Sequence, residues 1–153
     1  MRIFGIFLVL GIIWISCTEE KQAKPDQTQS PKTEVKKEEP KEVDPRVVEG
    51  EDNYKKHCMT CHMKDGYGVP NLNPPLAETE WVNGNKDTLI SIVLEGRTGE
   101  MEVNGEVYNG VMIPHNHLSD QEIATILTYV RASFGNKSSP IMEEEVASVR
   151  AQI

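Results

Sequence analysis

The segment Cys58-Met59-Thr60-Cys61-His62 constrains this chain more than any other part of the sequence. Two cysteines separated by two residues and followed directly by histidine are typical of a c-type haem attachment site. Each thiol forms a thioether bond to one vinyl group of the same porphyrin, so a single helical turn must place both sulfurs beside one edge of the ring. The adjacent imidazole then offers its Nε2 atom to the iron. The motif therefore predicts one covalently bound haem c.

Other uses of a Cys-x-x-Cys pair fit the sequence less well. A zinc site needs two further Cys or His ligands at matching spacing, and no cysteine follows Cys61. A thioredoxin-like redox pair needs a βαβ setting, whereas the flanking pattern here is helical. A disulfide between Cys58 and Cys61 suits an exported protein, but it leaves His62 without a role.

Composition limits the class of protein and the class of partner. The chain has 153 residues, the size of a single domain. Its formal net charge of −8 argues against nucleic-acid binding and against electrostatic docking on anionic lipid, and favours redox proteins with a basic patch as partners. Aromatic residues make up only 6 %, so a buried haem would supply apolar volume that the core otherwise lacks.

Residues 1–17 are predicted to be a signal peptide. The apolar stretch from Ile3 to Ile15 is short for a transmembrane helix, which needs about 20 residues, and suits the apolar part of a signal. Ser16-Cys17 resembles the lipobox of bacterial lipoproteins, although Trp14 stands where that motif prefers an aliphatic residue. We expect Cys17 to be lipidated and to anchor the protein to a membrane. A plain cleaved signal and an uncleaved anchor are the alternatives.

The remaining chain divides into three parts. Residues 18–44 are rich in Lys, Glu, Pro, Gln and Thr, a composition typical of a disordered linker. Residues 45–137 are predicted to form the haem domain. Residues 138–153 form a C-terminal tail that begins irregularly and ends in a short helix.

A helix from Pro45 to Cys58 leads into the motif. Asp44 is the predicted N-cap and Pro45 suits the first helical position. Gly50, Tyr54 and Cys58 recur every four residues and share one face. Because glycine in a helix interior costs about 1 kcal/mol relative to alanine, Gly50 indicates the close approach of another helix.

Two further elements are expected before the C-terminal helix. Asp87 can cap a short apolar helix that ends at Gly96. The Asn104-Gly105 pair lies between apolar residues and predicts a tight turn, with a small β-ribbon from Met101 to Tyr108. The C-terminal helix itself is predicted from Asp120 to Phe134.

A capping box, Ser119-x-x-Glu122, marks the start of that helix. Between the motif and these elements lies an irregular loop rich in Gly and Pro. A prolyl carbonyl in this loop can accept the Nδ1–H of His62, which sets the tautomer and orientation of a ligating imidazole. Pro74 is the candidate, and Pro70 lies in a similar Pro-x-Leu context.

The sixth position of the iron needs a second ligand if the protein is an electron carrier. Met112 is the candidate because its loop has Gly110 before it and Pro114 after it, which favours a fixed side chain. A neutral, soft thioether favours ferrous iron. Met101 is the alternative. The other residues considered are Met63, Met142, His115 and His117.

The sequence from about Val47 to Ile153 resembles the class I (mitochondrial-type) monohaem c-type cytochromes. The matching segments are Gly50-x-x-x-Tyr54-x-x-x-Cys58-x-x-Cys61-His62, Asn73-Pro74-Pro75-Leu76-Ala77, Val103-Asn104-Gly105-x-x-Tyr108-Asn109-Gly110-Val111-Met112, Leu118-Ser119-Asp120-x-Glu122-Ile123-Ala124, Leu127-Thr128-Tyr129-Val130-Arg131, Phe134-Gly135-Asn136 and Glu145-Val146-Ala147-Ser148-Val149-Arg150-Ala151. The resemblance implies an all-α cytochrome c fold with the haem in an apolar crevice. The first helix would cross the last at Gly50, Tyr54 and Tyr129, and His62 and Met112 would be the axial ligands. In one departure, Ile113 follows Met112 where the family usually has proline.

The resemblance also implies a function. Its bacterial members serve respiratory chains as free carriers, or as cytochrome subunits of periplasmic dehydrogenases, oxidases and nitrite reductases. We therefore expect an extracytoplasmic single-electron carrier, not an enzyme, that is a monomer or a subunit of a redox complex. A haem c enzyme or gas-binding protein with a displaceable sixth ligand is the alternative, although a dihaem peroxidase would need a second Cys-x-x-Cys-His. A non-haem interaction lipoprotein is the third hypothesis.

Overall fold

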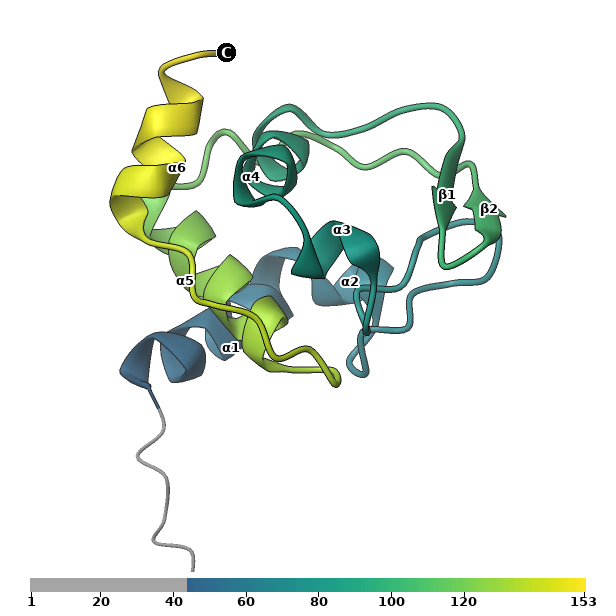
Figure 1. The fold of residues 1–153 in the computed structure, drawn as a ribbon, viewed down its shortest axis with the longest axis horizontal. Coiled ribbons are helices and arrows are strands. Elements are labelled where there is room, and N and C mark those ends of the chain that lie inside the picture. The colour runs from purple at the N-terminus through teal and green to yellow at the C-terminus, as the bar shows by residue number, and fades with distance from the viewer. Residues whose placement is uncertain (1–43) are drawn as a thin grey trace, which may run out of the picture. The chain divides into compact units, whose positions relative to one another are not determined.

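The computed structural model describes residues 44–153. The predicted signal peptide, Cys17 and nearly all of the predicted linker lie outside the described residues. The fold is mostly helical with one small β-ribbon, as predicted (Figure 1). The elements in this part of the chain are α1 (Pro45–His57), α2 (Met59–His62), α3 (Glu80–Asn83), α4 (Lys86–Glu95), β1 (Met101–Val103), β2 (Glu106–Tyr108), α5 (Asp120–Ala132) and α6 (Glu143–Arg150).

α1 and α5 cross and make the most extensive contact between elements in the described part of the chain (Figure 1). Gly50 is buried there, and a Cβ atom at this position would lie 2.0 Å from the carbonyl oxygen of Thr125 and 2.8 Å from Tyr129 Cβ. The rings of Tyr54 and Tyr129 pack with their centroids 5.4 Å apart. The predicted crossing at Gly50, Tyr54 and Tyr129 is confirmed, although α5 is followed by a further helix.

The start signals of the helices are partly as predicted. The Asp44 side chain accepts a hydrogen bond from the backbone N–H of Arg46, and Ser119 and Glu122 form the capping box of α5. The prediction that Asp87 caps α4 was wrong. The side chain of Asn85 accepts from the backbone N–H of Thr88 at 2.9 Å, so the helix begins one residue before Asp87.

The end of α5 also differs from the prediction. The helix ends at Ala132, two residues before Phe134, because Phe134 and Gly135 adopt left-handed backbone angles with φ of 56° and 83°. This turn reverses the chain and places the Phe134 ring 5.5 Å from both Tyr54 and Tyr129. An aromatic cluster therefore lies where α1 and α5 cross.

The C-terminal tail packs onto the rest of the domain. Ile141, Val146 and Val149 are buried, and α6 contacts both α4 and α5. Glu145 on α6 pairs with Lys86 at the start of α4, with 2.8 Å between Oε1 and Nζ. Residues 138–153 are therefore part of the same packed unit as the predicted haem domain.

The predicted β-ribbon is present. β1 and β2 pair in antiparallel fashion, with Met101 opposite Tyr108 and Val103 opposite Glu106. Short α3 was not predicted; Thr79 caps it by accepting from the backbone N–H of Val82. Across residues 44–153, no helix combines the length and the apolar character needed to cross a membrane.

Candidate functional site

A cavity of about 230 Å³ lies between the helices, the β-ribbon and the two loops that contain Pro74 and Met112. Most of its wall is apolar. α4 and α5 supply one side, and the loop after His62 supplies another. Among the residues that line it are Leu76, Val82, Leu89, Val93, Leu127 and Val130. Such a wall suits a flat apolar group.

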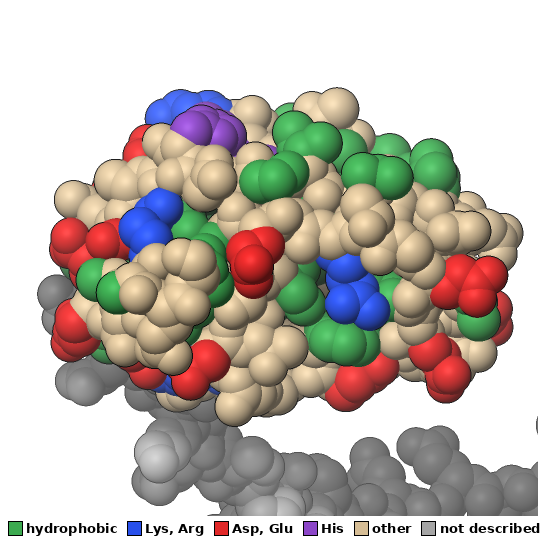
Figure 2. Space-filling model, turned by 90° about the horizontal axis from the view of Figure 1, so that it is seen from above, with side chains coloured by type: hydrophobic (Ala, Val, Ile, Leu, Met, Phe, Trp, Pro, Cys, Tyr) green, Lys and Arg blue, Asp and Glu red, His purple; other side chains and the backbone are tan. Residues whose placement is uncertain are grey.

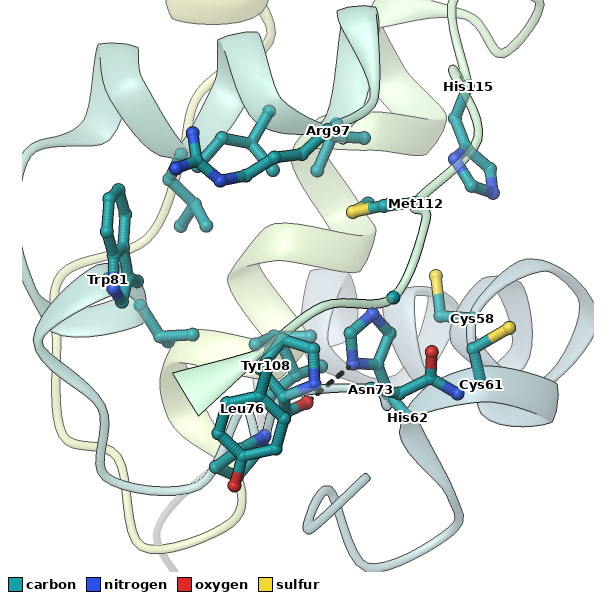
Figure 3. Close-up of a pocket in the computed structure, with 18 of the residues that line it drawn as sticks. Cys58, Cys61, His62, Asn73, Leu76, Trp81, Arg97, Tyr108, Met112 and His115 are labelled. Atoms are coloured by element: carbon teal, nitrogen blue, oxygen red, sulfur yellow. Dashed lines mark hydrogen bonds between the residues drawn. The ribbon is translucent and has the colours of Figure 1, made fainter. Parts of the chain in front are cut away.

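His62 projects into this cavity from α2 (Figure 3). The side chain is buried, and Nδ1 lies 3.1 Å from the carbonyl oxygen of Pro74, the contact expected from the sequence. Burial is the main cause that lowers the pKa of His62, and the Pro74 carbonyl acts in the opposite direction. With Nδ1–H donating to Pro74, a neutral imidazole keeps the Nε2 lone pair free for a ligand.

Cys58 and Cys61 do not form a disulfide with each other. Cys58 lies between α1 and α2 and is half-buried, whereas Cys61 is exposed on α2. Figure 3 shows both sulfurs at the same end of the cavity. Burial raises the pKa of the Cys58 thiol to about 12, with a smaller contribution from Cys61. Within residues 44–153, no group of three or more His, Cys, Asp or Glu side chains gathers to hold a metal ion.

Met112 lies across the cavity from His62, and its sulfur projects into the cavity (Figure 3). Its backbone forms an isolated β-bridge with Arg97: each N–H donates to the other residue's carbonyl at 2.9 Å. Gly96 makes this approach possible, because a Cβ atom there would lie 2.4 Å from the Met112 oxygen and its φ is 72°. The end of α4 therefore fixes the backbone of Met112.

The structure reduces the set of candidate sixth ligands. Met112, Met101 and His115 line the cavity. The other residues considered do not: Met63 and His117 are exposed, and the Met142 sulfur instead lies 3.0 Å from Nη1 of Arg46. Three of the six candidates are thus placed where they can reach a group bound in the cavity.

Arg97 and Trp81 lie together at one end of the cavity. The sequence did not predict this pair. The Arg97 guanidinium stacks over the Trp81 ring, 5.4 Å from its centroid, and the indole N–H donates to the Glu102 carbonyl at 2.9 Å. Figure 3 shows both side chains at the end opposite the two cysteines. Arg97 Nε and His115 Nδ1 are buried without a hydrogen-bond partner in the protein. An arginine in a loop carries no sequence signal that distinguishes it from an ordinary surface residue.

These features together fit haem c. Two thiols occupy one end of the cavity, an imidazole faces a thioether across it, and the walls between them are apolar. At the far end, the unpartnered Arg97 N–H and its positive charge suit the carboxylates that haem carries on the edge opposite its vinyl groups. The residues present therefore match the group that the motif predicts.

Residues 47–133 match the protein-family model described as cytochrome c.

The chain belongs to the cytochrome c family.

Curated relatives agree with this assignment. Cytochrome c-552 of Thermus thermophilus is 36 % identical over 104 residues, which cover 62 % of this chain and 79 % of that protein. The cytochrome c subunit of the quinone alcohol dehydrogenase of Gluconacetobacter polyoxogenes is 35 % identical over 94 residues, covering 60 % of this chain and 20 % of the subunit. The fructose dehydrogenase cytochrome subunit of Gluconobacter japonicus is 31 % identical over 113 residues, covering 69 % and 23 %. The chain thus spans only about a fifth of these two dehydrogenase subunits.

Membership in the cytochrome c family establishes the cofactor and the general role. A cytochrome c domain binds haem c covalently and carries electrons, so the predictions of covalent haem c and of a carrier rather than an enzyme are confirmed. Bacterial c-type cytochromes are extracytoplasmic proteins. The all-α prediction is confirmed together with its β-ribbon.

Proposed function

We propose that this cytochrome c holds one haem c through Cys58 and Cys61, with His62 and Met112 as the axial ligands, and passes single electrons between a donor and an acceptor protein. The observation that carries this proposal is the placement of the His62 imidazole and the Met112 sulfur on opposite sides of one apolar cavity that has both thiols at its end. When bound, haem supplies a one-electron iron couple whose potential depends on the axial ligands and on burial.

The protein's own residues prepare this site. The Pro74 carbonyl accepts from His62 Nδ1 and so fixes the tautomer and the ring orientation of the ligand. The apolar wall keeps water away, which supports a high potential together with the neutral thioether. Arg97 offers a charge-assisted hydrogen bond to a carboxylate at the far end of the cavity.

The rim of the cavity provides the proposed docking face. Leu72, Val111 and Ile113 all line the cavity, and 52 %, 65 % and 64 % of their surfaces are exposed. Figure 2 shows hydrophobic side chains gathered along one border of the molecule, with acidic side chains over other parts of the same face. Exposed apolar side chains that cluster around a site mark an interaction surface. A redox partner that docks here approaches the cofactor closely.

We further propose that the protein works outside the cytoplasm, anchored by a lipid on Cys17, in a respiratory or dehydrogenase electron-transfer chain. The lipobox-like Ser16-Cys17 supports the anchor, and the cytochrome subunits of alcohol and fructose dehydrogenases among the relatives support the type of chain. The Cys17→Ser variant should leave the membrane fraction. If that variant still sediments with membranes as the unaltered protein does, the anchor proposal is wrong.

Absorption spectroscopy tests the axial ligands. The ferric protein should show the weak charge-transfer band of methionine bound to iron, and Met112→Ala should abolish it. Met101→Ala and Met63→Ala should both retain the band, since Met101 is the competing cavity residue and Met63 lies outside the cavity. If Met112→Ala keeps the band and Met101→Ala loses it, the ligand is Met101.

Carbon monoxide tests the alternative function. With Met112 bound, the ferrous protein should not bind carbon monoxide readily, whereas Met112→Ala should. Ready binding to the unaltered protein would instead favour a gas-binding protein or an enzyme with a displaceable sixth ligand. The redox partners can be sought by capture on the oxidised and the reduced protein in parallel.

A further inference from the structure

We propose that Arg150, on α6, is a positioning residue for Met112: it holds the segment that follows Met112 and so keeps the thioether on the iron. The inference rests on the proposed axial role of Met112. It assigns a function in ligation to α6, which contributes no residue to the cavity wall.

The Arg150 guanidinium makes three hydrogen bonds to the chain from Asn116 to Asp120. Nη1 donates to the carbonyl of Asn116 and Nη2 to the carbonyl of Leu118, each at 2.8 Å. Nε donates to Oδ1 of Asp120 at 2.7 Å. One side chain thus bonds to two backbone positions of the loop and to the first residue of α5.

The held segment has little apolar anchoring of its own. Ile113, Pro114, Asn116 and His117 are all exposed, and only Leu118 of this stretch is buried. The backbone N–H of His115 donates to the Val93 carbonyl at 2.9 Å, and this hydrogen bond connects the backbone of the stretch to α4. Hydrogen bonds, rather than packing, therefore hold the loop, and Arg150 supplies two of those bonds.

The helix that carries Arg150 is itself firmly placed. Val146 and Val149 are buried against the core, and α6 contacts both α4 and α5. The end of α4 also holds Met112 itself, through the β-bridge to Arg97. The Met112 loop is thus fixed by α4 at its start and by α6 at its end, and these two helices are joined to each other.

A methionine ligand leaves the iron when its loop opens, which is a local unfolding event. Added cyanide binds ferric iron only in that open form, so its binding rate reports the population of the open form. Loss of hydrogen bonds from a charged donor to two carbonyls raises that population. We expect Arg150→Ala to bind cyanide about tenfold faster than the unaltered protein.

Two further variants separate the mechanism from general loss of packing. Lys86→Ala removes the ion pair between α4 and α6 without touching the Met112 loop, and should bind cyanide at nearly the unaltered rate. Arg150→Lys keeps a positive charge near Asp120 but lacks the planar fork that reaches both carbonyls. Its rate should therefore lie close to that of Arg150→Ala. Should Arg150→Ala fail to fold, the cyanide binding rate of Arg150→Lys is compared with the rates of the unaltered protein and of Lys86→Ala instead.

Hydrogen exchange gives a second readout. The hydrogen-bonded amides of His115 and Leu118 should exchange faster in Arg150→Ala and keep their protection in Lys86→Ala. Equal cyanide rates in Arg150→Ala and the unaltered protein, or an equal rise in Lys86→Ala, would overturn the inference. If Met112→Ala keeps the charge-transfer band, Met112 is not the axial ligand, and the inference about Arg150 is wrong for that reason. If Met112→Ala loses the band while the Arg150 variants behave normally, only the role of Arg150 fails.

Discussion

The hydroxyl of Tyr54 donates a hydrogen bond of 2.6 Å to the backbone carbonyl of Met63, the residue directly after His62. Met63 adopts a left-handed backbone angle, φ 62°, which is uncommon for a residue with a side chain. Tyr54 also packs against Tyr129 in the crossing of α1 and α5. One side chain therefore connects the helix crossing to the end of the haem-binding motif.

Removal of the Tyr54 hydroxyl should weaken the fold without opening the aromatic cluster. In Tyr54→Phe the Met63 carbonyl loses the donor of a partly buried hydrogen bond, so the free energy of unfolding should fall by about 1 kcal/mol. Chemical denaturation measures this difference. Tyr67→Phe is the matched control, because Tyr67 is 64 % exposed and should give no measurable change. Equal stability of both variants would show that the hydrogen bond contributes nothing.

Gly50→Ala should be strongly destabilising although alanine favours helices. The new Cβ would lie 2.0 Å from the Thr125 carbonyl oxygen, so α1 and α5 must separate. We expect a loss of about 3 kcal/mol in unfolding free energy, at the upper end for an overpacked site. Val48→Ala, at an exposed position of the same helix, should change stability by less than about 0.5 kcal/mol. A stable Gly50→Ala protein would contradict the close crossing.

Asn136 should be among the most sensitive polar positions. It is 4 % exposed, and its Nδ2 donates to the carbonyls of Leu76 and Val130. Its Oδ1 accepts from the backbone N–H of Glu78. Because Asn136→Ala leaves the Val130 carbonyl unpaired in the core and removes the partners of two partly buried backbone groups, it should lower the unfolding free energy by about 3 kcal/mol. Asn109→Ala, at an exposed position, serves as the control, and thermal melts compare the two.

The contribution of Glu145 should depend on pH. Its pKa lies below the ordinary value of 4.5, mainly because its side chain accepts from Lys86. A carboxyl whose pKa is lowered by folding stabilises the protein above that ordinary value and loses the effect as the pH falls through the folded value. Glu145→Gln should therefore be less stable by up to about 1 kcal/mol at pH 7.

The same two proteins should have equal stability at acidic pH. Once Glu145 is protonated, the charge that distinguishes it from Gln is gone. Denaturation series at pH 7 and well below pH 4.5 measure the convergence. A stability difference that stays constant across this range would show that the ion pair with Lys86 has no role.

Arg97→Met should lower the reduction potential. The variant keeps an apolar stem over Trp81 but removes the positive charge at the end of the cavity. That positive charge favours the electron-rich reduced state. We expect a decrease of up to about 59 mV, a tenfold change for one electron. Lys137→Met removes a charge from an exposed residue outside the cavity and should leave the potential nearly unchanged. Redox titration of the two variants decides.

Local signals in the sequence predicted most of the fold. The Asp44 cap, the Ser119–Glu122 capping box and the Asn104-Gly105 turn each depend on residues close together in the chain, and each is present. The mistakes are also local. Asn85 and Asp87 are both residue types that cap helices. Asn85 caps α4 because its side chain accepts from the backbone N–H of Thr88. The early end of α5 depends on how Phe134 packs against Tyr54. No local sequence pattern predicts that packing.

The candidate site was predictable only in part. The motif and the Met112 loop are visible in the sequence, and His62 and Met112 lie on the same cavity. The contacts of Arg97, Arg150 and Asn136 were not predicted because their partners are distant in the chain; the bond from Asn136 to Leu76 spans 60 residues. No composition or periodicity marks an arginine that will meet a carbonyl on another element. Such contacts depend on how the helices pack.

The crossing of α1 and α5 also bears on the order in which the site is made. Asn53 on α1 donates to the Thr125 hydroxyl 72 residues later, and α5 contributes Leu127 and Val130 to the cavity wall. Until α5 packs against α1, this part of the wall is absent and the end of the cavity beside Cys58 is open. The enclosure of the site therefore depends on a helix that lies more than 50 residues after the haem-binding motif in the chain.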